Sequence, residues 1–103
     1  MAIKRYRVII EDEAIADLAS IRDYIARKAP DTAIEFIDYL LDEIYKLETL
    51  PHGHQEVRPP SPRLPFSIRR LPVGGYRVLY TVAEEGNVVR VLGVQHGSRR
   101  TWP

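Results

Sequence analysis

The feature that most constrains this chain is the dipeptide Gly74-Gly75, which lies between two runs that favour strands, residues 66–73 and residues 76–82. A two-residue hairpin loop needs positive φ angles at its central positions, and glycine accepts such angles at little cost. The sequence therefore predicts an antiparallel hairpin whose register is fixed at these two glycines.

A third strand follows the hairpin. The segment Glu-Glu-Gly-Asn at residues 84–87 is typical of a turn, and residues 88–94 are rich in valine, a residue that favours strands. His96 comes where this strand ends. The last third of the chain is thus predicted to form a three-stranded antiparallel meander.

The first half of the chain favours one short strand and two helices. Residues 3–10 suit a strand, and apolar residues then recur at helical spacing over residues 12–28, with acids at residues 11–13 where a helix would begin. Pro30 suits the first turn of a second helix, which is predicted to run to about Leu50. So short a connection folds the two helices into an antiparallel hairpin. We expect an α+β fold with this helix hairpin packed on one face of the sheet.

The length of 103 residues indicates one domain spanning residues 1–103. No apolar run approaches the roughly 20 residues that span a bilayer, and the N-terminus lacks the apolar stretch of a signal peptide, so we expect a soluble, cytoplasmic protein with no membrane partner. The chain has no cysteine, His52 and His54 have no third ligand at a suitable spacing, and nucleotide-binding motifs are missing. We therefore expect no metal site and no cofactor.

Charge is segregated along the chain. Residues 1–10 carry a formal charge of +3, residues 11–57 a charge of −8 and residues 58–103 a charge of +6. If the first strand joins the C-terminal sheet, the molecule has an acidic helical side and an arginine-rich sheet side. Such a sheet attracts nucleic acid or an acidic protein segment, although scattered solvated arginines would give the same counts.

Several motifs occur in an order that resembles the RelE/ParE superfamily of toxins from bacterial type II toxin–antitoxin modules, which includes plasmid-stabilisation proteins. These motifs are Ala16-Asp17-Leu18-x-x-Ile21-x-x-Tyr24-Ile25-Ala26, Pro51-x-Gly53, Gly74-Gly75-Tyr76-Arg77-Val78-Leu79-Tyr80 and His96-Gly97-Ser98-Arg99. The resemblance covers nearly the whole chain. It implies a small cytoplasmic toxin that arrests growth and is neutralised in a hetero-oligomer with a cognate antitoxin.

The superfamily implies two alternative activities. ParE-like members inhibit DNA gyrase without an established hydrolytic centre, whereas RelE-like members are endoribonucleases that cleave mRNA on the ribosome. The chain has no lysine after Lys46, and its ending His96-Gly97-Ser98-Arg99 is closer to the ParE-like pattern. We therefore expect a ParE-like gyrase inhibitor, and whether the chain is an enzyme stays open because the RelE-like alternative remains.

The resemblance also implies site residues. For a RelE-like nuclease, Arg77 would contact the scissile phosphate, and His96 and Glu56 would exchange protons with the 2′-hydroxyl and the leaving oxygen. For target or partner binding, the chemistry of arginine predicts Arg69, Arg70, Arg99 and Arg100, because arginine favours phosphate and interface contacts. Trp102 is added as an aromatic residue that could anchor an interface or cover the sheet.

Each of these residues also has a structural explanation. Arg77 could pair with a helix carboxylate, His96 could be a hydrogen-bonded histidine at a strand end, and Glu56 could be a solvated charge. Three tyrosines on the predicted helices, Tyr24, Tyr39 and Tyr45, suit the margin of a core as well as a recognition surface.

Overall fold

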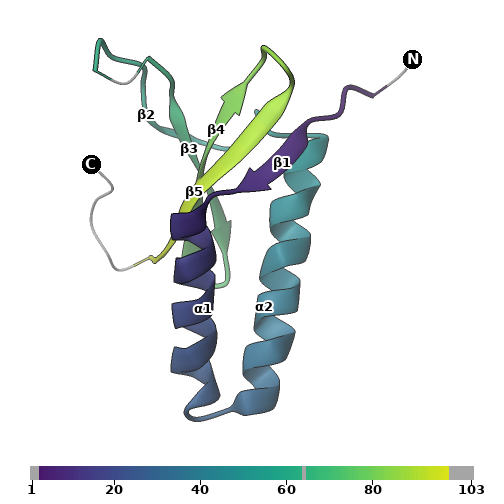
Figure 1. Ribbon diagram of the computed structural model, residues 1–103, viewed down its shortest axis with the longest axis vertical. Helices are drawn as coiled ribbons and strands as arrows, with labels where there is room; N and C mark the ends of the chain where they lie inside the picture. Colours follow the sequence, from purple (N-terminus) through teal and green to yellow (C-terminus); the bar gives the residue numbers. More distant parts are fainter. Residues whose placement is uncertain (1–2, 64, 98–103) are drawn as a thin grey trace.

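The computed structural model describes residues 3–63 and 65–97, in which two helices pack on one five-stranded sheet (Figure 1). The elements in chain order are β1 (Arg7–Ile10), α1 (Asp12–Ala26), α2 (Pro30–Tyr45), a single 3-10 turn (Lys46–Glu48), β2 (Glu56–Arg58), β3 (Ile68–Val73), β4 (Tyr76–Ala83) and β5 (Val88–His96). The α+β class, the helix hairpin and the meander are as the sequence predicts.

The hairpin at the two glycines is confirmed. Gly74 and Gly75 have φ angles of 46° and 79°, and β3 pairs antiparallel with β4 from Val73 opposite Tyr76 to Arg69 opposite Tyr80. Gly74 also lies close to α2, since a Cβ built on it would be 3.1 Å from Cε1 of Phe36. The second turn needs positive φ angles as well, at Gly86 and Asn87, and it leads directly into β5.

The sheet has two features beyond the predicted first strand and meander. Its strand order is β1-β5-β4-β3-β2, and β1 pairs parallel with β5, so the sheet is mixed rather than wholly antiparallel. The proline-rich stretch from residue 51 to residue 65 contributes the short strand β2 at the opposite edge. Proline lacks an N–H donor and is confined to edges, which is consistent with a three-residue strand that ends before Pro59.

Both helices begin where the sequence indicates. Asp12 and Glu13 lie in the first turn of α1, and Pro30 is the first residue of α2. Glu11 is the N-cap residue of α1, but it makes no side-chain cap hydrogen bond and instead accepts one from Arg90 at 2.9 Å. The second helix ends at Tyr45, earlier than predicted, because the apolar spacing continues through a 3-10 turn.

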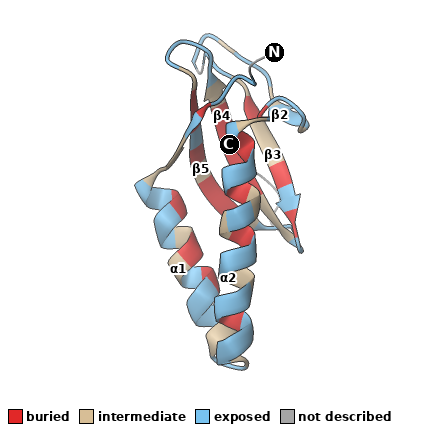
Figure 2. Ribbon diagram, turned by 90° about the vertical axis from the view of Figure 1, so that its right-hand side faces the viewer, coloured by how far each residue is buried: buried red, intermediate tan, exposed pale blue. Residues whose placement is uncertain are grey.

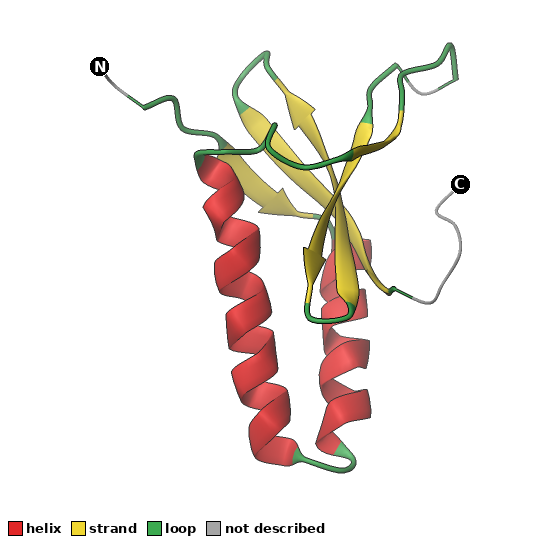
Figure 3. Cartoon of the chain, turned by 180° about the vertical axis from the view of Figure 1, so that it is seen from behind, coloured by secondary structure: helices red, strands yellow, loops and turns green. Residues whose placement is uncertain are grey.

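The main core lies between the helix hairpin and one face of the sheet, where buried residues face each other (Figure 2). Its largest fully buried members include Tyr80, Leu40 and Ile44. From behind, the helices extend well past the end of the sheet (Figure 3). No helix in the described part of the chain is long and apolar enough to cross a membrane.

Candidate functional site

Each of the five strands places one arginine on the sheet face that points away from the helices. These residues are Arg7, Arg58, Arg70, Arg77 and Arg90, and we call them the arginine face. Side chains alternate between the two faces of a strand, and residues directly opposite each other on neighbouring strands share a face. The register of the sheet therefore assigns these five side chains to one side.

The assignment follows from strand to strand. In β4, Val78 and Tyr80 belong to the core under the helices, so Arg77 and Leu79 point the other way. Arg70 of β3 is opposite Leu79 and therefore joins Arg77. Arg58 is opposite Ile68, which lies two residues before Arg70 and shares its face. A register shift between Glu56 and Arg58 places these two residues of β2 on opposite faces.

The other edge follows by the same reasoning. Arg90 of β5 is opposite Thr81 of β4, which lies two residues after Leu79. Arg7 of β1 is opposite Val88, which lies two residues before Arg90. The pairing of β5 with β4 shifts register between Val91 and Gly93, the partners of Tyr80 and Leu79. This shift comes after Val88 and Arg90, so it does not change the face to which they belong. The expectation of an arginine-bearing sheet is thus met, with a set of residues that only the register identifies.

Amide oxygens accept hydrogen bonds from two of the central guanidinium groups. Arg70 donates to Oε1 of Gln55 at 2.7 Å, and Arg77 donates to Oε1 of Gln95 at 3.5 Å. The amide oxygen of Gln55 orients the guanidinium of Arg70 without cancelling its charge. Arg90 forms an ion pair of 2.9 Å with Glu11.

Arg69 points to the opposite face from Arg70 and holds a loop. It lies opposite Tyr80, a core residue, and its Nη1 donates to the carbonyl oxygens of His54 at 2.8 Å and His52 at 3.5 Å. The hydroxyl of Tyr80 donates to the carbonyl oxygen of Pro51 at 2.6 Å. Burial raises the pKa of Tyr80 from 10.0 to about 12, partly opposed by the charge of Arg69. Arg69 therefore fixes residues 51–54 from the helix side of the sheet.

The three residues predicted for catalysis do not converge. Arg77 lies on the arginine face, whereas His96 lies directly opposite Tyr76 and therefore shares the helix side, with its ring edge-on to that of Tyr76 at 5.2 Å. Glu56 is exposed on β2, three strands away from β5. At about 4.8 Å between neighbouring strands, Glu56 is separated from His96 by roughly 14 Å or more.

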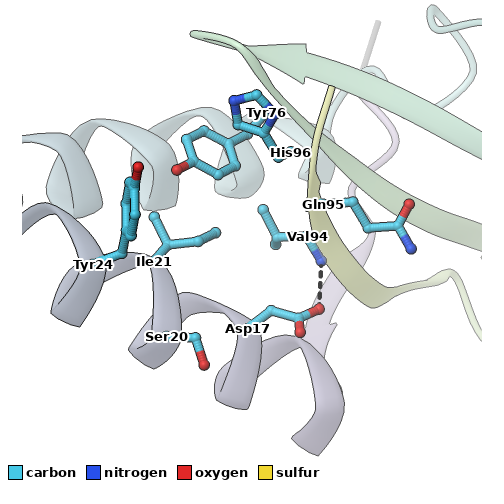
Figure 4. A pocket seen from close by; sticks show the side chains of 8 residues that line it. All are labelled: Asp17, Ser20, Ile21, Tyr24, Tyr76, Val94, Gln95 and His96. Atoms are coloured by element: carbon cyan, nitrogen blue, oxygen red, sulfur yellow. Dashed lines mark hydrogen bonds between the residues drawn. The ribbon is translucent and has the colours of Figure 1, made fainter. Parts of the chain in front are cut away.

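A pocket of about 400 Å³ opens between α1 and the end of β5 (Figure 4). Its lining residues are Asp17, Ser20, Ile21, Tyr24, Tyr76, Val94, Gln95 and His96. Oδ2 of Asp17 accepts a hydrogen bond of 2.9 Å from the backbone N–H of Val94. In the close-up, Tyr24 and Tyr76 come together at one end of the pocket, and the side chain of Gln95 points away from it.

The pocket lies beside a part of β5 that β1 does not reach. The strand β1 pairs with β5 only from Val88 to Val91, whereas β5 continues to His96. Tyr24 at the pocket is 62% exposed, and Tyr39 and Tyr45 on α2 are each 51% exposed. The three tyrosines are therefore surface residues rather than the margin of the core.

A cluster around Glu84 joins the N-terminal segment, the loop after the helices and the turn between β4 and β5. The carboxylate of Glu84 accepts hydrogen bonds from Nζ of Lys4 at 2.7 Å and from the hydroxyl of Tyr6 at 2.9 Å, and it contacts Nε2 of His52 at 2.5 Å. These hydrogen bonds, that of Lys4 first, lower the pKa of Glu84 from 4.5 to about 2. Although its partners are polar and partly exposed, this cluster is structural in character, since it ties three segments together.

Three of the predicted binding residues, Arg99, Arg100 and Trp102, lie outside the described residues. Within residues 3–63 and 65–97, no three histidine or acidic side chains are grouped as metal ligands would be. Sequence patterns alone did not identify Arg7, Arg58 and Arg90 as members of one surface. The alternation of side chains shows which residues of one strand share a face. Only the pairing of the strands shows which faces of different strands form one surface.

Comparison with known proteins gives a family match. Residues 8–101 match the family described as "ParE toxin of type II toxin-antitoxin system, parDE". A search of curated proteins finds no match.

Solved structures share the fold. A chain of the chromosomal ParDE toxin–antitoxin system of P. aeruginosa superposes with a TM-score of 0.71 at 18% identity, covering 90% of this chain and 97% of that one. A chain of the RelBE2 toxin–antitoxin complex of Mycobacterium tuberculosis gives 0.63 at 20% identity, with 92% and 94% covered. A chain of the RelE–RelB complex of Pyrococcus horikoshii gives 0.62 at 22% identity, with 93% and 99% covered.

Proposed function

The chain belongs to the ParE toxin family of type II toxin–antitoxin systems, and from that premise we propose that it inhibits DNA gyrase by binding and that a cognate antitoxin neutralises it in the cytoplasm. The family match spans residues 8–101, which include both helices and all five strands except the first residue of β1. The toxin role thus concerns the whole fold and not a fragment of it.

The observation that carries the proposal of binding is the dispersal of the candidate catalytic groups. Cleavage at a 2′-hydroxyl needs a base, an acid and a stabilising charge around one phosphate, within hydrogen-bond reach of the reacting atoms. Arg77 and His96 lie on opposite faces of the sheet, and Glu56 lies at its far edge. A protein with this arrangement is better suited to occupying a target than to cutting RNA.

For the antitoxin, the best supported place is the pocket between α1 and β5. Exposed Tyr24 and the apolar side chains of Ile21 and Val94 offer a recess for an apolar side chain, and tyrosine is enriched at interfaces. No β1 residue pairs with β5 beyond Val91, and we expect a segment of the antitoxin to lie along this stretch beside the pocket.

The test of the target is a supercoiling assay with gyrase and purified toxin, run beside mRNA cleavage on programmed ribosomes. We expect loss of supercoiling with intact mRNA, and the loss should disappear when the purified antitoxin is added. Cut mRNA with unaffected gyrase would overturn the proposal in favour of a ribosome-dependent endoribonuclease.

The test of the antitoxin site is the affinity of the Tyr24→Ala variant for the purified antitoxin. Truncation of an aromatic residue at an interface commonly costs about 1–3 kcal/mol, which is roughly a 5- to 150-fold weaker complex. Tyr45→Ala is the matched control, because Tyr45 is also exposed on a helix but lies outside the pocket. Equal affinities for the two variants would exclude the pocket as the docking place.

A further inference from the structure

We infer that the arginine face binds the phosphodiester backbone of duplex DNA, so that the toxin contacts the nucleic acid of its target directly. The inference rests on the proposed function only in the choice of target, since gyrase acts on duplex DNA. The binding itself would be a property of the free chain.

The charged strand residues of the arginine face all have the same sign of charge. The described strand residues on this side of the sheet include five arginines and no acid, because Glu56, the only acidic strand residue, is opposite Arg69 and so belongs to the other side. Arg58 and Arg70 form no ion pair with a carboxylate in the described part of the chain. Since arginine binds phosphate oxygens through a planar, bidentate fork, an anionic polymer complements this face.

Three of the arginines form a diagonal row. Arg58, Arg70 and Arg77 belong to consecutive strands β2, β3 and β4, and each is shifted by two residues from the one before. Diagonal neighbours of this kind lie roughly 7–8 Å apart in a sheet. That spacing is comparable to the distance between successive phosphates along one nucleic-acid strand, so the row can follow a single backbone.

The side chains between the arginines favour a duplex over a single strand. Binding of single-stranded RNA or DNA relies on aromatic side chains on which unpaired bases stack. The described strand residues on this face include no aromatic residue, and several of those between the arginines, among them Ile68, Leu79 and Thr81, are buried. Contacts with a nucleic acid therefore fall to the arginine side chains, which bind backbone phosphates and leave the bases paired.

The acidic side of the molecule would orient the complex. Residues 12–45, which form the two helices and their connection, carry a formal charge of −6 and cover the opposite face of the sheet. Repulsion between these helices and the duplex disfavours every approach except that of the arginine face. Arg90 contributes less than Arg58 and Arg70, because its charge is paired with Glu11 whereas those two form no ion pair within the described residues.

The experiment measures the affinity of the full chain for a fluorescently labelled duplex of 20 base pairs by anisotropy over a series of salt concentrations. The variant is Arg58→Gln/Arg70→Gln, which removes two charges of the row. We expect roughly tenfold or more weaker binding at low salt, and a slope of log affinity against log salt that falls by about 2, since each lost phosphate contact lowers it by about 1.

The matched control is Arg22→Gln/Arg27→Gln, which removes the same charge from exposed positions around the end of α1. It should bind like the wild type, and thermal melts should show that both variants are folded. The inference is overturned if the two double variants lose equal affinity, if the slope is unchanged, or if a single-stranded RNA of 20 nucleotides binds more tightly than the duplex.

Gyrase assays separate this inference from the proposed function. Binding of DNA through the arginine face without inhibition of gyrase would refute the proposed target and leave the inference standing. Full inhibition of gyrase by the Arg58→Gln/Arg70→Gln variant, together with no affinity of the wild type for DNA, would refute the inference and leave the proposed function standing. Binding of gyrase protein that depends on these arginines without DNA would assign the face to a protein contact and would also overturn the inference.

Discussion

Replacing Tyr80 with phenylalanine removes one buried hydroxyl and little else. The side chain is fully buried, and its hydroxyl donates to the carbonyl oxygen of Pro51, a buried residue, at 2.6 Å. In Tyr80→Phe, that carbonyl loses its partner, and a buried polar group left unsatisfied costs about 1–3 kcal/mol. In a domain of about 100 residues, each kcal/mol lowers the melting temperature by about 4–8 °C.

The assay is urea unfolding of both proteins at several pH values, with thermal melts beside it. Below pH 10 the wild type should be more stable by about 1–3 kcal/mol. Burial raises the pKa of Tyr80 from 10.0 in the unfolded chain to about 12 in the folded protein, so its contribution to stability is present below pH 10 and is lost as the pH rises towards 12. The difference between wild type and Tyr80→Phe should therefore shrink over this range.

Tyr39→Phe is the control, because Tyr39 is 51% exposed and has the same intrinsic chemistry. It should unfold within about 0.5 kcal/mol of the wild type at every pH. Tyr80→Phe unfolding at the same urea concentration as Tyr39→Phe would refute the argument that the hydroxyl holds the loop at Pro51. A constant difference between wild type and Tyr80→Phe from pH 10 to pH 12 would refute the assignment of the raised pKa.

Two further predictions concern the Glu84 cluster and the hairpin. The pKa of Glu84 is lowered from 4.5 to about 2, so its ionised carboxylate stabilises the fold above pH 4.5, and this stabilisation is lost as the pH falls towards 2. In Glu84→Gln, acid unfolding should therefore depend less steeply on pH over this range than in the control Glu85→Gln. Equal profiles for the two variants would contradict the role of the cluster. Gly74→Ala and Gly75→Ala should each lower the free energy of unfolding by about 1–2 kcal/mol, because both positions have positive φ angles. Gly74→Ala should be the more destabilising of the two, because its Cβ would lie 3.1 Å from Phe36 whereas that of Gly75 meets nothing within 4 Å. Denaturant midpoints in the opposite order would contradict this packing.

The local features of the fold were accessible from the sequence. Gly74-Gly75 fixed a turn because its backbone angles are a property of the residues themselves, and Pro30 marked a helix start for the same reason. The predicted end of the second helix was wrong because apolar spacing continues in a 3-10 turn, where Leu47 is still buried. The strand β2 was missed because three residues between prolines carry too weak a pattern.

The candidate site was accessible only in part. The chemistry of arginine suggested Arg69 and Arg70 together as binding residues, yet neighbouring residues on a strand point to opposite faces. Arg69 holds the loop at His54, whereas Arg70 joins the arginine face. Likewise, Arg77 and His96 are close in the sheet but lie on different sides of it. Sequence proximity and shared chemistry gave no information on these separations.

The sequence by itself determined the elements, their order, the segregation of charge and the resemblance to a toxin family, because each depends on residues that are near one another along the chain. The tertiary structure alone decided which arginines share a surface. That set depends on the register of five strands, including a parallel pair that joins residues about 80 positions apart, Arg7 and Val88. A shift of one residue in any pairing would turn that strand's arginine to the helix side, so the arginine face exists only through contacts that no local pattern encodes.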